Sequence, residues 1–215
     1  MTLNSDQSAL VHQYIEKSGI KFVDIGDEII DHICTQIESD IDGGCSFDDA
    51  FDRSKRKWKL WLKKDSSAWI GWIYSLPRIA LNRAVKRQKA IYLEIIMLSL
   101  AAYCGLFLIK KVDIIDASTL YRACCTIFIM LICINFWLSA RLWLSGFKST
   151  YRFLFFQSGY LWLSLFYFYI FFLIEYPQNS SIEILILGAC ISNLVYIKEG
   201  LKHFSLQRPL QRNNG

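Results

Sequence analysis

The chain has 215 residues, of which 53% are hydrophobic and 20% are charged, and its formal net charge is +5 at pH 7. The charge is unevenly divided, because the stretch from Phe22 to Asp52 holds ten acidic residues and no lysine or arginine. The basic excess lies beside long apolar segments, where it suits anionic lipid headgroups better than nucleic acid. We therefore expect no nucleic-acid partner, since that interpretation of the charge is the weaker one, and the composition predicts a membrane protein with one small soluble domain.

The N-terminal residues predict three short helices, each with one apolar stripe. The first covers about Asp6–Lys17 and the second about Asp24–Asp42. The third opens at Ser46, whose hydroxyl can cap the backbone N–H near Asp49. The expected stripes are Leu10, Val11, Tyr14 and Ile15; Ile30, Ile33, Ile37 and Ile41; and Phe47, Ala50, Phe51, Trp58 and Leu62. Nothing here alternates with a period of two, so residues 1–65 are predicted to form a cytosolic three-helix bundle without a sheet.

The second and third predicted helices carry a recognisable pattern. Asp31-His32-Ile33 is followed by the double glycine Gly43–Gly44 and then by Ser46-Phe47-Asp48-Asp49-Ala50-Phe51. Over about residues 8–62 this pattern resembles the small helical domain called HAAS. The resemblance implies a cytosolic signalling or interaction module without known catalysis, which in bacterial membrane proteins precedes transmembrane helices and is often encoded beside PadR-like transcription regulators. Lys17–Lys21 stands where many members carry a Leu-Pro turn.

One face of the second predicted helix is acidic and is the first candidate binding surface. Its members are Asp27, Glu28, Asp31 and His32. Glu28 and His32 are four residues apart, a spacing that a metal ion can use, but a metal site needs a third and a fourth ligand. The only other histidines are His12 and His203. We therefore predict no metal, no cofactor and no catalytic residue, and we expect this face to dock a basic surface of a protein partner.

The third predicted helix and the stretch after it carry a second candidate surface, which is basic and aromatic. Its members are Arg53, Lys55, Arg56, Lys57, Trp58, Lys59, Trp61, Trp69 and Trp72. Indole rings can stack on nucleic-acid bases or lie among lipid headgroups. Because the chain must return to the bilayer by Ala90, we expect contact with anionic lipid. Residues 66–89 are predicted to be an amphipathic interfacial linker that lies in the headgroup plane.

Four long apolar segments fill the second half of the chain: Ala90–Ile109, Ala123–Ala140, Phe153–Ile174 and Ile182–Ile197. About 20 apolar residues in a helix cross a hydrocarbon core of roughly 30 Å. The first and third segments meet that length, the second does if it continues through Trp143, and the fourth spans only with local bilayer thinning or added flanking residues. The predicted fold class is thus all-α, with a small N-terminal three-helix cytosolic bundle followed by a four-helix transmembrane bundle over residues 90–197.

Lysine and arginine lie mostly on one side of these segments. The residues expected on that side are Arg78, Arg83, Lys86, Arg87 and Lys89; Arg141, Lys148 and Arg152; and Lys198, Lys202, Arg208 and Arg212. Positive loops stay in the cytoplasm, so both termini are predicted to be cytoplasmic in a multi-pass protein of the bacterial cytoplasmic (inner) membrane. Residues 198–215 are predicted to form a disordered basic tail.

The apolar segments contain no ionisable residue near the midplane and no paired Gly/Pro interruption, which are common features of transporters. No histidine lies in any of them, so an intramembrane hydrolase is not indicated. The favoured hypothesis is a non-enzymatic signalling, regulatory or accessory membrane protein whose acidic domain binds a cytosolic or membrane protein partner. The alternative is a small-molecule transporter or channel subunit that acts as an oligomer, and a homo-oligomer is left open.

Overall fold

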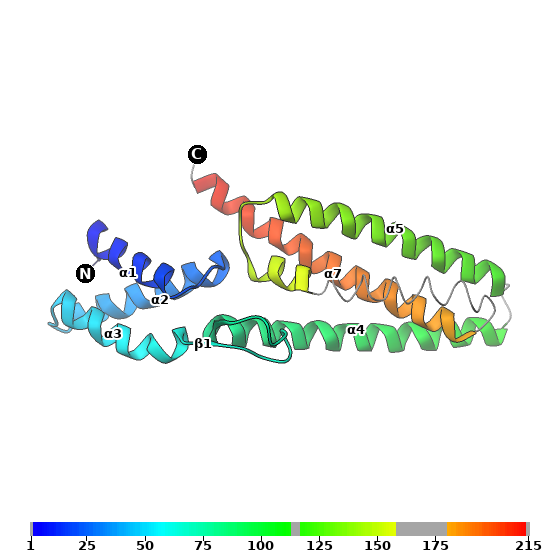
Figure 1. The fold of residues 1–215 in the computed structure, drawn as a ribbon, viewed down its shortest axis with the longest axis horizontal. Helices are drawn as coiled ribbons and strands as arrows, with labels where there is room; N and C mark the ends of the chain where they lie inside the picture. The colour runs from blue at the N-terminus through cyan, green and yellow to red at the C-terminus, as the bar shows by residue number, and fades with distance from the viewer. Residues whose placement is uncertain (1, 113–116, 158–179, 214–215) are drawn as a thin grey trace. The chain divides into compact units, whose positions relative to one another are not determined.

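The computed structural model describes residues 2–112, 117–157 and 180–213, which are almost entirely helical (Figure 1). Its elements are α1 (Ser5–Lys17), α2 (Val23–Asp42), α3 (Phe47–Leu62), β1 (Lys64–Asp65), β2 (Leu76–Pro77), α4 (Arg78–Val112), α5 (Ala117–Leu144) and α7 (Ser180–Asn213). The predicted all-α class is confirmed. Two compact units divide the chain: Met1–Gln88 with Phe147–Thr150, and Lys89–Gly146 with Tyr151–Gly215. The first unit therefore includes most of the predicted linker.

Local capping explains both ends of α1 and the start of α3. The Asn4 side chain accepts a hydrogen bond from the Gln7 N–H at 2.8 Å, while the Gln7 side chain accepts one from the Asn4 N–H at 3.1 Å. This reciprocal pair satisfies two donors at the start of α1. Gly19, with a φ of +85°, follows the end of α1, as is common for helix C-termini. Ser46 caps α3 as predicted, since its Oγ accepts from the Asp49 N–H at 3.2 Å.

The core of the first three helices is built around isoleucines of α2. The residues buried in α1, α2 and α3 include Val11, Ile15, Ile25, Ile29, Ile33, Ile37, Ala50, Phe51 and Leu62. Ile33 and Ile37 were predicted, whereas Ile30 and Ile41 are only half-buried. The buried stripe has a regular spacing of four residues and continues towards the start of α2. It contains Ile25 and Ile29 in place of the predicted Ile30 and Ile41.

A two-residue antiparallel ladder follows α3, so the expectation of no sheet is wrong in this detail. Lys64 lies opposite Pro77, and Asp65 lies opposite Leu76. The ladder is extended by a hydrogen bond from the Arg78 N–H to the Lys63 carbonyl at 3.0 Å. Two-residue strands are too short to produce an alternating pattern in the sequence. The ladder brings the end of α3 to the start of α4.

In the second unit α5 and α7 run in the same direction, because their contacts occur in the same order along both helices. Asn135 of α5 donates a hydrogen bond to the Asn193 side chain of α7. Further towards the C-terminal ends of both helices, the Oγ of Ser145, just after α5, lies 2.9 Å from the Nε2 of His203 in α7. Phe128, Leu131, Ile186 and Cys190 form an apolar core in this unit. The α5–α7 interface is thus mostly apolar, with one amide pair in which Asn193 is buried and Asn135 is half-buried.

The part of α4 in the second unit runs opposite to α7, as Figure 1 shows. Glu94, near the start of this part, forms an ion pair with Lys198, near the end of the apolar part of α7. Helix α7 continues to Asn213. Residues 198–213, which were predicted to belong to a disordered tail, are therefore helical, because Glu199, Gly200 and His203 are buried on one side of the helix.

Two helices of the described residues are long and apolar enough to cross a membrane, over Arg78–Leu108 and Arg122–Leu144. In the most apolar 18-residue stretch of the first helix only 6% is buried, and in that of the second helix 22% is buried. The core helix of a soluble protein hides its apolar side chains, so this exposure favours a lipid environment. Of the other predicted spans, residues 182–197 lie in α7, and most of residues 153–174 lies outside the described residues.

The packing around Gly200 of α7 leads to a first prediction. A Cβ at this position would lie 2.8 Å from Leu138 Cδ2 and 2.9 Å from Phe155 Cδ2. We expect Gly200→Ala to lower the thermal midpoint of the detergent-solubilised chain, because overpacking costs about 1–3 kcal/mol. The matched control is Gly188→Ala on the same helix, where nothing lies within 4 Å. That control should be neutral or stabilising, and equal midpoints for the two variants would contradict the close packing at Gly200.

Candidate functional site

The acidic residues predicted to bind a partner lie together on α2, and all four side chains are exposed. Asp27, Glu28, Asp31 and His32 occupy two successive turns of this helix. Among the described residues, no hydrogen bond or ion pair involves Asp27 or Asp31. Both residues are exposed to a cationic partner, although partial burial raises the pKa of Asp27 and the nearby His12 opposes this shift.

Glu28, by contrast, already has a partner within the first unit. Both guanidinium Nη atoms of Arg83, in the first turns of α4, donate hydrogen bonds to its two carboxylate oxygens. This bidentate contact lowers the pKa of Glu28 below its usual value, and the His32 ring lies 3.8 Å away on the other side. Sequence reasoning missed the pair because the two residues are 55 positions apart and leave no local signal.

The N-terminus of α2 is held by residues from far along the chain. The Val23 N–H donates to the Lys148 carbonyl at 3.0 Å. The Asp24 carboxylate accepts a hydrogen bond from the Thr150 N–H, also at 3.0 Å. Ser149 and Thr150 are buried. The segment predicted to connect the second and third apolar segments therefore packs against α2 inside the first unit.

The basic side of α3 is less uniform than the sequence suggests. Arg53 contacts the Asp40 carboxylate at 3.4 Å, and Lys55 contacts that of Asp52 at 2.7 Å. Lys57 donates a hydrogen bond to the Gln36 side chain at 3.1 Å. These three cations therefore already have partners within the three-helix bundle. The exposed members of the predicted surface on this helix that remain are Arg56, Lys59 and Trp61, while Trp58 is half-buried.

The two remaining aromatic members of the predicted lipid surface lie in the loop between β1 and β2. Trp69 and Trp72 are both exposed. Between them, Ile70 is fully buried, so it anchors the loop to the first unit. The chain turns at Gly71, whose φ is +93°, a value that glycine adopts without strain. The loop thus presents Trp72 from a fixed backbone.

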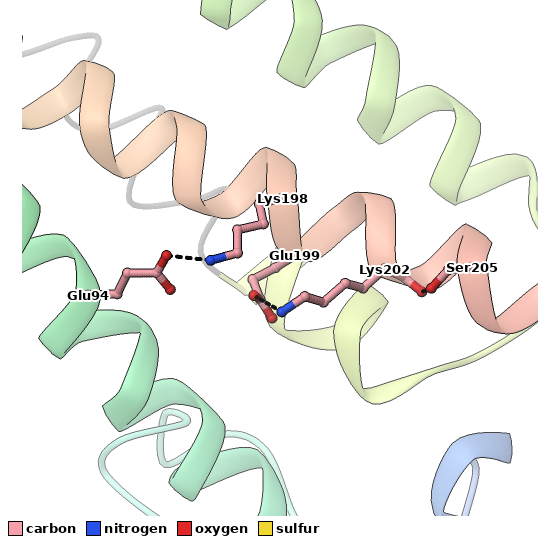
Figure 2. A network of polar contacts seen from close by, with 5 residues as sticks. All are labelled: Glu94, Lys198, Glu199, Lys202 and Ser205. Atoms are coloured by element: carbon pink, nitrogen blue, oxygen red, sulfur yellow. Dashed lines mark hydrogen bonds and ion pairs between the residues drawn. The ribbon is translucent and has the colours of Figure 1, made fainter.

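Sequence reasoning missed a cluster of polar residues where α5 ends and α7 passes. Glu199 and His203 have no exposed surface, and Lys202 Nζ lies 2.8 Å from Glu199 Oε1. Figure 2 shows this pair beside the Glu94–Lys198 pair. Arg152 Nη1 donates to the Ser145 carbonyl at 2.6 Å. The available signal was the spacing of Glu199, Lys202 and His203, which places all three on one face of a helix.

Within this cluster, Ser145 and His203 have the distance expected of a nucleophile and its base, but the hydrogen bonds point to a structural role. The Ser145 Oγ lies 2.8 Å from the Leu142 carbonyl, to which its single proton is donated. The His203 Nε2 lies 2.9 Å from the same Oγ, and the tautomer of the ring sets which atom donates. This arrangement ties the end of α5 to α7.

A metal ion needs a set of several ligand side chains. Within them, no group of three or more His, Cys, Asp or Glu side chains converges in a way that could hold a metal ion. The spacing of Glu28 and His32 would suit a metal ion, but the Glu28 carboxylate is instead bonded to Arg83.

Comparison with known proteins adds no assignment. No family model matches the chain, and neither a curated protein nor a solved structure matches it.

Proposed function

We propose that this chain is a multi-pass protein of the bacterial cytoplasmic membrane that acts without catalysis in signalling, regulation or as an accessory subunit. Its N-terminal helices form a HAAS-like cytosolic domain that docks a protein partner through the acidic face of α2, and its basic surfaces contact anionic lipid. The observation that carries the proposal is the coexistence of two apolar, exposed helices with an open pair of carboxylates on a separate compact unit.

The directions of the helices support four crossings. Helix α5 is parallel to α7, so a chain that crosses at α5 must return through the bilayer before it enters α7. The apolar segment Phe153–Ile174 lies between them in the sequence and has the length for that return crossing. The Glu94–Lys198 pair places the beginning of the first apolar segment level with the end of the fourth. Both termini then lie on the same side, and the positive loops make that side the cytoplasm.

The contacts of α2 give docking a route to the spans. Asp27 and Asp31 are open, while the neighbouring Glu28 is bonded to Arg83 of α4 and Asp24 to the backbone of Thr150. A partner that approaches Asp27 and Asp31 with cationic groups competes with Arg83 for Glu28 or shifts α2. Either event changes contacts made by the start of α4 and by the segment between α5 and the next span. We therefore assign α2 the role of receiving the partner and transmitting its presence.

The α5–α7 interface supports a signalling or accessory role over transport. Its described core is apolar, and its two amides, the half-buried Asn135 and the buried Asn193, bond to each other rather than line a path. Paired amides of this kind hold transmembrane helices together, at an average of about 0.6 kcal/mol each.

Charge reversal tests the docking surface. We expect the Asp27→Lys/Asp31→Lys variant to lose its copurifying partner from solubilised membranes, with a drop in affinity of tenfold or more, because facing like charges costs several kcal/mol. The matched control is Glu16→Lys/Asp48→Lys, which reverses two exposed acids on α1 and α3. Retention of the partner at unchanged strength by the α2 variant, or equal loss by the control, would show that the α2 face is not the docking surface.

A further inference from the structure

The loop between β1 and β2 presents an apolar tip that the proposed docking and transmission do not use. Trp72 is 75% exposed and Ile73 is 86% exposed. These are adjacent large apolar side chains on the unit that carries the acidic domain. Isolated exposed apolar residues are ordinary on soluble proteins, but a tryptophan next to an isoleucine at the tip of a projecting loop is typical of a surface with an apolar partner.

The backbone holds these two residues in place. The Tyr74 N–H donates to the Gly71 carbonyl at 3.1 Å, which closes a tight turn with Trp72 and Ile73 at its two central positions. A preceding turn is closed by the Ile70 N–H, which donates to Ser67 at 3.1 Å. Because Ile70 is fully buried and β1 pairs with β2, both ends of the loop are fixed. The exposure of the tip is thus built into the fold.

The loop extends from the ladder in the same direction as the first turns of α4, as Figure 1 shows. Four residues from Leu76 to Trp72 can reach about 13 Å when extended. The first turns of α4, from Arg78 to Gln88, rise about 15 Å along the helix. The reach of the loop is thus comparable with the length of these first turns.

The charges around the loop indicate what kind of surface meets the tip. Two exposed cations lie at the start of the loop: Lys63 precedes β1, and Lys64 is the first residue of β1. Arg78, at the end of the second strand, is paired with Asp65 at 3.1 Å. Tryptophan is the residue most at home at the boundary between headgroups and acyl chains, and lysine near it favours anionic lipid.

We propose that residues 66–75 form an insertion loop that places Trp72 and Ile73 below the headgroups of an anionic bilayer. This inference rests on the proposed membrane location. It replaces a linker lying flat in the headgroup plane with a loop whose turn enters the bilayer. Lipid, and no protein partner, is its occupant.

The test uses the full chain in vesicles of phosphatidylglycerol and phosphatidylcholine brominated in the acyl chains. We compare the intrinsic fluorescence of the wild type and of Trp72→Phe, which keeps an apolar ring at the tip. The signal lost in the variant should be quenched by the brominated lipid and protected from aqueous acrylamide. Trp137→Phe, in the proposed span of α5, is the reference for a tryptophan in lipid.

Each outcome decides the matter. A Trp72 signal that acrylamide quenches and bromine does not would overturn the insertion loop, as would a signal that neither quenches, which would mean that protein covers the tip. If Trp137 is quenched by bromine while Trp72 is not, the membrane location stands and only the loop fails. If neither tryptophan is quenched by bromine, the proposed function fails with it.

Discussion

Replacing Phe136 by arginine is expected to reduce stable membrane insertion of the chain by about 100-fold. Phe136 lies near the middle of the apolar part of α5, and 79% of its surface is exposed. An arginine near the centre of a transmembrane helix costs about 2.5–3.5 kcal/mol, and each 1.4 kcal/mol is a factor of ten. In water, the same change at such an exposed site would shift stability by about 0.5 kcal/mol or less. The size of the effect of Phe136→Arg therefore shows whether this side chain faces lipid or water.

The measurement is the fraction of chain that resists alkaline extraction from membranes. The control is Leu60→Arg on α3, another exposed large apolar side chain, which lies in the proposed cytosolic domain and should have no effect. If Phe136→Arg inserts and accumulates as well as the wild type, the exposed face of α5 does not meet lipid.

The second large effect concerns the buried carboxylate of α7. Lys202→Met removes the described cation beside Glu199, which has no exposed surface. Breaking a fully buried pair costs about 3–5 kcal/mol, and we expect about 2 kcal/mol here because the lysine is one-third exposed. The unfolding midpoint of the chain in detergent should fall accordingly.

A double variant separates this effect from lost packing. Lys202→Met/Glu199→Gln removes the buried charge together with its partner, so it should recover at least half of the lost stability. Lys198→Met, which breaks the more exposed pair with Glu94, should cost less than about 1 kcal/mol. A double variant less stable than Lys202→Met alone would show that Glu199 contributes through contacts other than its charge pair.

Much of the local structure could be predicted because its causes are local. The Ser46 cap depends on residues within one turn, and the helix ends near Gly19 and Gly44 follow from glycine conformations. Apolar length alone located the two exposed helices among the described residues. The predicted stripe of buried isoleucines lay too far towards the C-terminal end of α2, because Ile30 and Ile41 match the helical periodicity nearly as well as Ile25 and Ile29 do.

The contacts that could give the molecule its function had no such local signal. Glu28 meets Arg83 across 55 positions, and Asp24 meets Thr150 across 126. Each of these residues reads as an ordinary surface charge or loop residue in the sequence. Their pairing depends on how α4 and the segment after α5 return to α2, which only the tertiary structure defines. The helical continuation through His203 was missed for the same reason, since its support comes from Ser145.

The orientation of the chain is tested most directly by protease access to tags at Met1 and after Gly215. The account predicts that both tags survive in intact spheroplasts and that both are cleaved in inside-out membrane vesicles. Cleavage of either tag from outside intact spheroplasts would contradict the account.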